Sequence, residues 1–132
     1  MTQQTISTTS ARRDTILVVD DNPDVCRLMR IVLSKKYDLL VANSATAALE
    51  LTKRHQPKLI LLDIMMPGEI DGLQLLDFIK TDSTLQDIIV GMVSARGQTA
   101  DWLDARIRAA NAYFVKPFSP LQVAAWVDSQ LQ

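Results

Sequence analysis

The sequence predicts a single α/β domain built around a parallel β-sheet. Five short apolar segments alternate along the chain with segments of helical periodicity, an order typical of strands joined by helical crossovers. The apolar segments are nearly continuous, as expected for strands that helices bury on both faces. A length of 132 residues suits one domain. We therefore expect a doubly wound (βα)5 domain with helices on both faces of the sheet.

The expected elements can be placed by their apolar runs and by their capping residues. Ser44 and Ser119 are suited to N-cap helices, and Pro23 and Pro120 suit the first helical position. A loop over 66–72 precedes a further helix, and another helix is expected within 97–110. The strands are expected at 15–20, 38–42, 58–63, 88–93 and 112–115. The Thr/Ser/Gln-rich segment 1–14 is expected to be a flexible tail, which leaves 15–132 as the domain.

Composition excludes several classes of function. With 14 basic and 15 acidic residues, the net charge of −1 argues against broad nucleic-acid binding. Cys26 is the only cysteine and His55 the only histidine, so an internal disulfide and a His/Cys zinc cluster are excluded. No apolar run approaches the ~20 residues of a membrane helix, and the amino end does not resemble a secretory signal. We expect a cytoplasmic protein that binds neither nucleic acid directly nor a membrane.

Three carboxylates stand where predicted strands end. Asp20 and Asp21 follow the first strand, and Asp63 ends the third. In open α/β sheets, ligands bind beyond the carboxyl ends of the strands, where the winding direction reverses. If the strand order is 2-1-3-4-5, the acids meet at that point. Because like charges held close together are unfavourable, a hard cation such as Mg²⁺ is the natural partner for them.

Two further polar residues follow the last two strands. Ser94 offers a hydroxyl and Lys116 an ammonium group. With a divalent cation, these are the donors needed to hold a tetrahedral anion. The combined set predicts phosphoryl transfer onto a carboxylate nucleophile.

Short motifs occur in a fixed order along these strands. They are Asp20-Asp21, LLDIMMP at 61–67, Asp71-Gly72, VSA at 93–95 and YFVKPF at 113–118. Together they resemble the receiver domain of two-component response regulators, over nearly the whole chain. The resemblance implies the sheet order 2-1-3-4-5 and a phosphorylation-controlled signalling switch rather than an enzyme. No output domain is expected in this chain.

The resemblance also implies roles for the matched residues. Asp63 would accept a phosphoryl group from a histidine kinase or a histidine phosphotransfer protein. Asp21, Asp63 and the main-chain carbonyl of Met65 would bind Mg²⁺, and Asp20 would act mainly through a water molecule. Ser94 and Lys116 would contact the phosphoryl oxygens, and the Lys116–Pro117 bond would be cis.

The resemblance further implies a switch and a partner surface. Tyr113 would turn inward when Ser94 moves toward the phosphate, which would remodel the surface formed by 97–110, 112–115 and the last helix. Trp102 and Trp126 either form a contact patch there, for a target protein or a second copy of the chain, or fold over local grooves. For Tyr113, simple packing in the sheet is an alternative role.

The sequence departs from the family pattern beside the acids. Three residues, Gly68-Glu69-Ile70, stand where two are common, so the loop is expected to bulge. Met65 and Arg96 occupy positions that vary in the family and affect hydrolysis. Both side chains could restrict an attacking water, which predicts slow autodephosphorylation.

Other functions remain as alternatives. Aspartates at strand ends can simply cap turns. A degenerate receiver would work without phosphate. An aspartate-nucleophile phosphatase would place a second aspartate where Met65 stands, and a flavin carrier would need a Ser/Thr/Gly-rich loop after the first strand in place of Asp20-Asp21-Asn22-Pro23.

Overall fold

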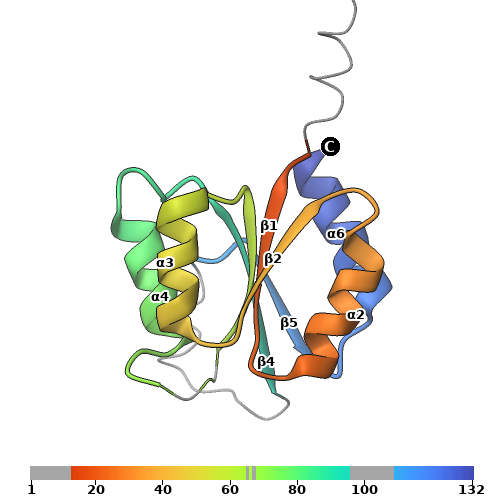
Figure 1. Ribbon diagram of the computed structural model, residues 1–132, viewed down its shortest axis with the longest axis horizontal. Helices are drawn as coiled ribbons and strands as arrows, with labels where there is room; N and C mark the ends of the chain where they lie inside the picture. Colours follow the sequence, from red (N-terminus) through yellow and green to blue (C-terminus); the bar gives the residue numbers. More distant parts are fainter. Residues whose placement is uncertain (1–12, 65, 67, 96–108) are drawn as a thin grey trace, which may run out of the picture.

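The predicted parallel α/β sheet is present. The computed structural model describes residues 13–64, 66, 68–95 and 109–132 (Figure 1). Its five strands pair in the order β2-β1-β3-β4-β5, and all four pairings are parallel. The strands are β1 (Thr15–Val19), β2 (Asp38–Ala42), β3 (Leu59–Asp63), β4 (Ile89–Ala95) and β5 (Ala112–Lys116). Both the fold class and the strand order are as expected.

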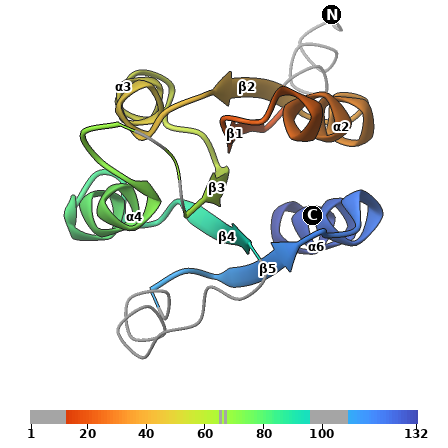
Figure 2. The same cartoon turned by 90° about the horizontal axis from the view of Figure 1, so that it is seen from below.

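The described helices cover both faces of the sheet. They are α2 (Pro23–Leu33), α3 (Ala45–His55), α4 (Gly72–Thr81) and α6 (Pro120–Leu131). Figure 2 shows α2 and α6 against one face and α3 and α4 against the other. The helix predicted within 97–110 lies outside the described residues, except for its last two positions. None of the described helices is long and apolar enough to cross a bilayer.

The helix starts follow from side chains that bind the first free backbone amides. Ser44 accepts a hydrogen bond from the amide of Ala47, and Ser119 accepts one from the amide of Gln122. Asp71 and Gln74 form a reciprocal capping box at the start of α4. These contacts span at most three positions, so the local sequence specifies them.

The core consists of two apolar layers, one on each face of the sheet. Successive residues of β1 and β3 enter opposite layers, which explains why these strands are apolar throughout. The layer under α3 and α4 includes Leu17, Val19, Ile60, Leu62, Leu73, Leu76 and Ile79. The layer under α2 and α6 includes Ile16, Val18, Met29, Leu33, Leu59, Leu61, Val123 and Val127.

Several expected strand boundaries shift by one or two residues. β4 continues to Ala95 and β5 to Lys116 because their pairing extends that far, so Ser94 lies inside β4 and Lys116 is the last residue of β5 rather than following it. At the amino end, residues 1–12 of the predicted tail lie outside the described residues. Its last two residues are attached to the domain. The Arg13 guanidinium donates to the carbonyl oxygens of Ser34 and Tyr37, and the Asp14 carbonyl accepts from the amide of Asp38.

Candidate functional site

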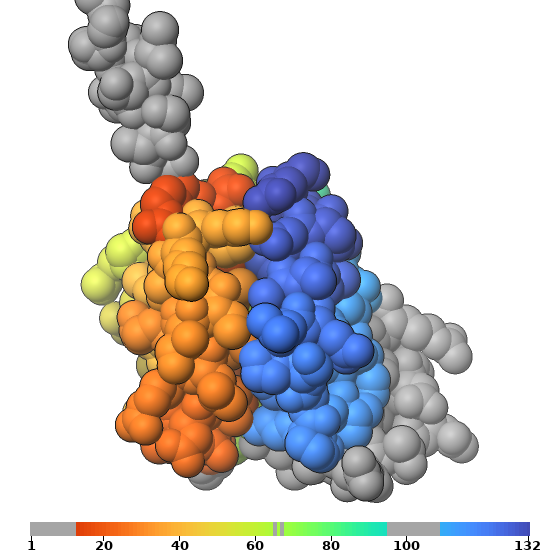
Figure 3. Space-filling view, turned by 90° about the vertical axis from the view of Figure 1, so that its right-hand side faces the viewer, coloured from red at the N-terminus to blue at the C-terminus, as the bar shows by residue number. Residues whose placement is uncertain are grey.

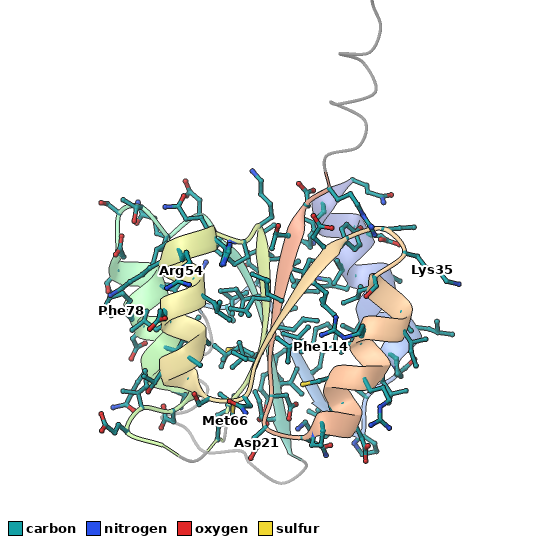
Figure 4. All side chains as sticks on the ribbon, in the orientation of Figure 1. Asp21, Lys35, Arg54, Met66, Phe78 and Phe114 are labelled. Atoms are coloured by element: carbon teal, nitrogen blue, oxygen red, sulfur yellow. The ribbon has the colours of Figure 1, made fainter. Side chains whose placement is uncertain are left out.

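The three acids meet at the carboxyl edge of the sheet, as the sequence predicted. Asp20 directly follows β1 and Asp63 ends β3, and these two strands are neighbours. The carboxylates of Asp20, Asp21 and Asp63 each place an oxygen within 4.8 Å of the others. Asp20 and Asp63 are 3% and 5% exposed, whereas Asp21 is exposed. Figure 4 shows Asp21 at the lower end of the molecule, where this edge lies.

Lys116 bridges two of these acids. Its Nζ lies 3.0 Å from Oδ2 of Asp20 and 3.2 Å from Oδ2 of Asp63. Partial burial alone would lower the pKa of Lys116, but the hydrogen bond to Asp20 and the charges of Asp63 and Asp20 outweigh it and raise the pKa. The ammonium group is therefore charged at neutral pH. The Lys116–Pro117 bond is cis, as the resemblance implied.

Backbone contacts orient Asp20. Its Oδ1 accepts a hydrogen bond from the amide of Asn22 at 2.9 Å, and its own amide donates to the carbonyl of Ala42 at 3.0 Å. Oδ2 is then left facing Lys116. The first turn of α2 thus holds one wall of the site, because the Asn22 side chain also caps that helix through the amide of Asp24.

Ser94 is paired with Tyr113. The two hydroxyl oxygens lie 2.5 Å apart, between neighbouring strands β4 and β5. Ser94 is fully buried, and the half-buried Tyr113 ring packs against the layer under α3 and α4. The ring of Tyr113 is therefore turned inward in this structure. Tyr113 therefore packs against the core and also contacts Ser94 through its hydroxyl.

Gly72 supports Asp63 in a way that the sequence did not reveal. A Cβ at this position would lie 2.2 Å from the carbonyl oxygen of Asp63 and 2.8 Å from Cα of Ile64. The Gly72 amide donates to the carbonyl of Ile64 at 3.0 Å. The start of α4 therefore packs directly on the backbone that carries Asp63. The Asp71-Gly72 pair was part of the motif set, but nothing in the sequence shows what the glycine contacts.

A cavity of about 550 Å³ opens beside the acids. It lies between the start of α2 and the end of β2, and its wall combines Asp20 and Asp21 with Arg27, Arg30 and Asn43. Arg27 is exposed and lies 3.8 Å from Asp24. The acids are thus reachable from this side.

The carboxylates suit a magnesium ion. Mg²⁺ takes oxygen ligands at about 2.0–2.1 Å, so two opposite ligands lie about 4.2 Å apart. The oxygen spacing of up to 4.8 Å is slightly wider, and small side-chain rotations or one intervening water would close the difference. The donor set therefore fits Mg²⁺.

Several predicted residues lie outside the described part of the chain. They are Met65, Arg96 and Trp102, together with Pro67 of the loop. Trp126 is described, and it folds over a local groove: its ring is half-buried and packs against the layer under α2 and α6. The loop beside Asp63 has Gly68 at φ 134°, and the half-buried Ile70 packs on the core.

Comparison with known proteins identifies the family. The model of the response regulator receiver domain matches residues 16–128, so the chain belongs to this family. Response regulator Rre1 of Synechocystis is 35% identical over 118 residues, which are 88% of this chain and 51% of that protein. The DNA-binding response regulator MtrA of Mycolicibacterium smegmatis is 32% identical over 121 residues, covering 91% of this chain and 51% of MtrA. The chain spans about half the length of these relatives.

Solved structures agree with this assignment. The receiver domain of NtrX from Brucella abortus is 33% identical, with a TM-score of 0.77, and the match covers 88% of this chain and 97% of that one. A putative response regulator from Chloroflexus aurantiacus is 29% identical, with a TM-score of 0.80 and coverage of 91% and 98%. Receiver domains are phosphoacceptors that work with histidine kinases and bind Mg²⁺ at an acidic pocket. The protein is thus part of phosphorylation-controlled two-component signalling.

Proposed function

We propose that Asp63 accepts a phosphoryl group from a histidine kinase or a histidine phosphotransfer protein. The observation that carries this proposal is the position of Asp63: its buried carboxylate lies beside two other acids and within 3.2 Å of the Lys116 ammonium. A carboxylate is a competent nucleophile when positive charge offsets the negative charge of the incoming phosphoryl group. Lys116 pairs with both Asp63 and Asp20, but the two oxygens of Asp20 are already engaged by Lys116 and by the amide of Asn22, so Asp63 is the better candidate.

Asp21, Asp63 and the main-chain carbonyl of Met65 would hold Mg²⁺, and Asp20 would reach it mainly through water. When bound, the ion neutralises charge on the phosphoryl oxygens. Asp20 suits an indirect role because its Oδ2 already pairs with Lys116 and its Oδ1 with the amide of Asn22.

The chain's own residues would perform the transfer by positioning and by charge. A carboxylate oxygen of Asp63 forms a bond to phosphorus as the phosphorus–nitrogen bond of phosphohistidine breaks. The electron pair of that bond stays on the imidazole nitrogen, and because the other ring nitrogen carries a proton, the leaving group is neutral imidazole. Lys116 donates a hydrogen bond to one phosphoryl oxygen, and Ser94 to another.

Ser94 and Tyr113 would then carry the change to the surface. Binding of Ser94 to the phosphoryl group favours one packing of Tyr113, and so shifts the population of β5, α6 and the segment 97–110 toward one arrangement. This surface would bind a target protein or a second copy of the chain. MtrA is named as DNA-binding, but the match covers only half of that protein. We therefore propose that residues 15–132 act as a receiver domain through contacts with other proteins in the cytoplasm. These residues would bind neither nucleic acid nor a membrane directly.

Incubation with acetyl phosphate and Mg²⁺, followed by intact-mass measurement, tests the proposal. We expect the gain of one phosphoryl group, lost in Asp63→Asn and on removal of Mg²⁺. Asp24→Asn removes an exposed carboxylate from α2 and should leave the gain intact. No gain in the wild-type protein would indicate a degenerate receiver, and continuous turnover of phosphate esters would indicate a phosphatase. The decay of the phosphorylated protein tests the slow autodephosphorylation expected from Met65 and Arg96.

A further inference from the structure

Trp126 connects α6 to the strand that carries Ser94. Its ring lies over Gly91 of β4, where an added Cβ would be 2.8 Å from Cζ3 and 3.0 Å from Cη2 of the indole. Any larger side chain at Gly91 would displace the ring. Because Gly91 has no side chain, the middle of β4 leaves room for the Trp126 ring.

The same ring contacts β5. The centroids of Trp126 and Phe114 are 5.5 Å apart, with the rings inclined by 70° in an edge-to-face arrangement. Figure 4 shows Phe114 on the side of the sheet that α2 and α6 cover. Trp126 thus spans two strands, through Gly91 on β4 and Phe114 on β5.

The Ser94–Tyr113 pair lies on the other face of those two strands. Tyr113 and Phe114 are consecutive in β5, so their side chains point to opposite faces of the sheet. Tyr113 bonds Ser94 on one face, while Phe114 meets Trp126 on the other. A movement of β5 that changes the Ser94–Tyr113 contact must also change the Phe114–Trp126 contact, because both rings belong to one strand.

We propose that Trp126 is a positioning residue that couples α6 to the Ser94–Tyr113 pair. The inference rests on the proposed function, because it explains how a change at the Ser94–Tyr113 pair would reach α6. In this structure, the inward Tyr113 and the seated Trp126 occur together. The Trp126 ring packed on Gly91 stabilises the position of β5 in which the hydroxyls of Ser94 and Tyr113 are in contact. By the same coupling, an anion bound at the site stabilises the packing of Trp126 on Gly91.

This coupling is reciprocal, so it can be measured from either end. The probe is beryllofluoride with Mg²⁺, a tetrahedral mimic of a phosphoryl group on a carboxylate. Its affinity is measured by calorimetry, which does not depend on tryptophan. Trp126→Ala should weaken binding about fivefold or more, and Trp126→Phe, which retains an aromatic ring, should stay within about twofold of wild type. Leu121→Ala is the matched control on α6, because Leu121 is 74% exposed, and it should bind as wild type does.

A second pair of measurements distinguishes coupling between Trp126 and the Ser94–Tyr113 pair from a general loss of fold stability. In a Tyr113→Phe background, the site hydroxyl contact is absent, so Trp126→Ala should change the affinity by less than about twofold. In a Trp102→Phe background, Trp126 is the only tryptophan, and its emission should change when beryllofluoride binds. This fluorescence measurement decides the question even if Trp126→Ala fails to fold.

The outcomes are distinct. Wild-type protein that binds no beryllofluoride in the presence of Mg²⁺ overturns the proposed function, and the coupling with it. Normal binding without an emission change, together with an unchanged affinity in any folded Trp126→Ala protein, overturns the coupling alone. An effect of Trp126→Ala that persists undiminished in Tyr113→Phe shows that the ring only stabilises the fold.

Discussion

Nζ of Lys116 lies 3.2 Å from Oδ2 of Asp63, although the two residues are 53 positions apart in the chain. The same ammonium group lies 3.0 Å from Asp20, so one cation partly neutralises two buried acids. The contact has two consequences for ligands. On the proposed function, Lys116 would offer a donor to an incoming phosphoryl group and would compete with Mg²⁺ for the same carboxylates.

Lys116→Met should tighten Mg²⁺ binding while slowing phosphoryl uptake. Removing a positive charge near the acids takes away its repulsion of the divalent ion, which is about 2 kcal/mol at 4 Å in water, or roughly a thirtyfold gain in Mg²⁺ affinity. The lost donor should lower the rate of labelling by acetyl phosphate. Calorimetry with Mg²⁺ and intact-mass kinetics measure the two effects.

Lys35→Met is the matched control for this charge change. Lys35 follows the carboxyl end of α2, whereas Asp21 precedes its amino end, and Figure 4 shows Lys35 on the right-hand flank, away from Asp21, where a charge is largely screened from the acids. Both Mg²⁺ affinity and labelling rate should remain as in the wild type. A Lys116→Met protein with weaker Mg²⁺ binding would show that Lys116 organises the acids instead of competing for them.

Ser94 and Tyr113 should be energetically coupled. Each single change, Ser94→Ala or Tyr113→Phe, should cost about 1 kcal/mol of unfolding free energy, because each removes one hydroxyl of a pair 2.5 Å apart. The double variant should be less destabilised than the sum, by about 0.5–1.5 kcal/mol. Urea denaturation of the four proteins gives the value, and strict additivity would mean that the hydroxyls do not interact in solution.

Gly72→Ala should destabilise the protein and disturb the site. Its Cβ would overlap the carbonyl oxygen of Asp63, and a shift of that backbone costs about 1–3 kcal/mol or more. Because the shift moves Asp63, Mg²⁺ affinity should fall as well. Glu69→Ala, which removes an exposed side chain from the same loop, should change the unfolding free energy by no more than about 0.5 kcal/mol. Normal stability and normal Mg²⁺ binding in Gly72→Ala would contradict the packing described here.

Ionisation of Tyr37 should lower the free energy of unfolding at alkaline pH. The Tyr37 hydroxyl donates a hydrogen bond to Oδ1 of Asp128 on α6, at an oxygen–oxygen distance of 2.5 Å. This bond joins the turn between α2 and β2 to α6, and Figure 3 shows α2 and α6 side by side. Burial, followed by the hydrogen bond and charge of Asp128, raises the pKa of Tyr37 from 10.0 to about 12. The folded state therefore holds this proton more tightly than the unfolded state does.

The resulting stabilisation is fully present below pH 10 and is lost as the pH rises toward about 12. Tyr37→Phe should cost about 1 kcal/mol at neutral pH and should flatten this part of the stability curve. Urea denaturation between pH 8 and about 12, the pKa of Tyr37, measures both effects. Identical pH profiles for the two proteins would mean that the Tyr37–Asp128 bond is not populated.

Much of the fold follows from the sequence alone. Apolar runs predict all five strands to within two residues at either end, because strands buried on both faces need apolar residues throughout. Ser44 and Ser119 predict two helix starts, since a cap is a contact between residues three positions apart. The acids at strand ends predict a metal-binding edge, because parallel strands bring their carboxyl ends to one side. The strand order itself came from the resemblance to receiver domains.

The tertiary structure decided the contacts that cross the sheet. Lys116 against Asp63, Ser94 against Tyr113, and Gly72 against the Asp63 carbonyl each join different elements of the fold. Such contacts depend on strand register and on how closely helices approach the sheet, and a one-residue slip would turn each side chain to the other face. A sequence pattern records which residues are apolar or charged, but only the packed sheet sets the distances between them.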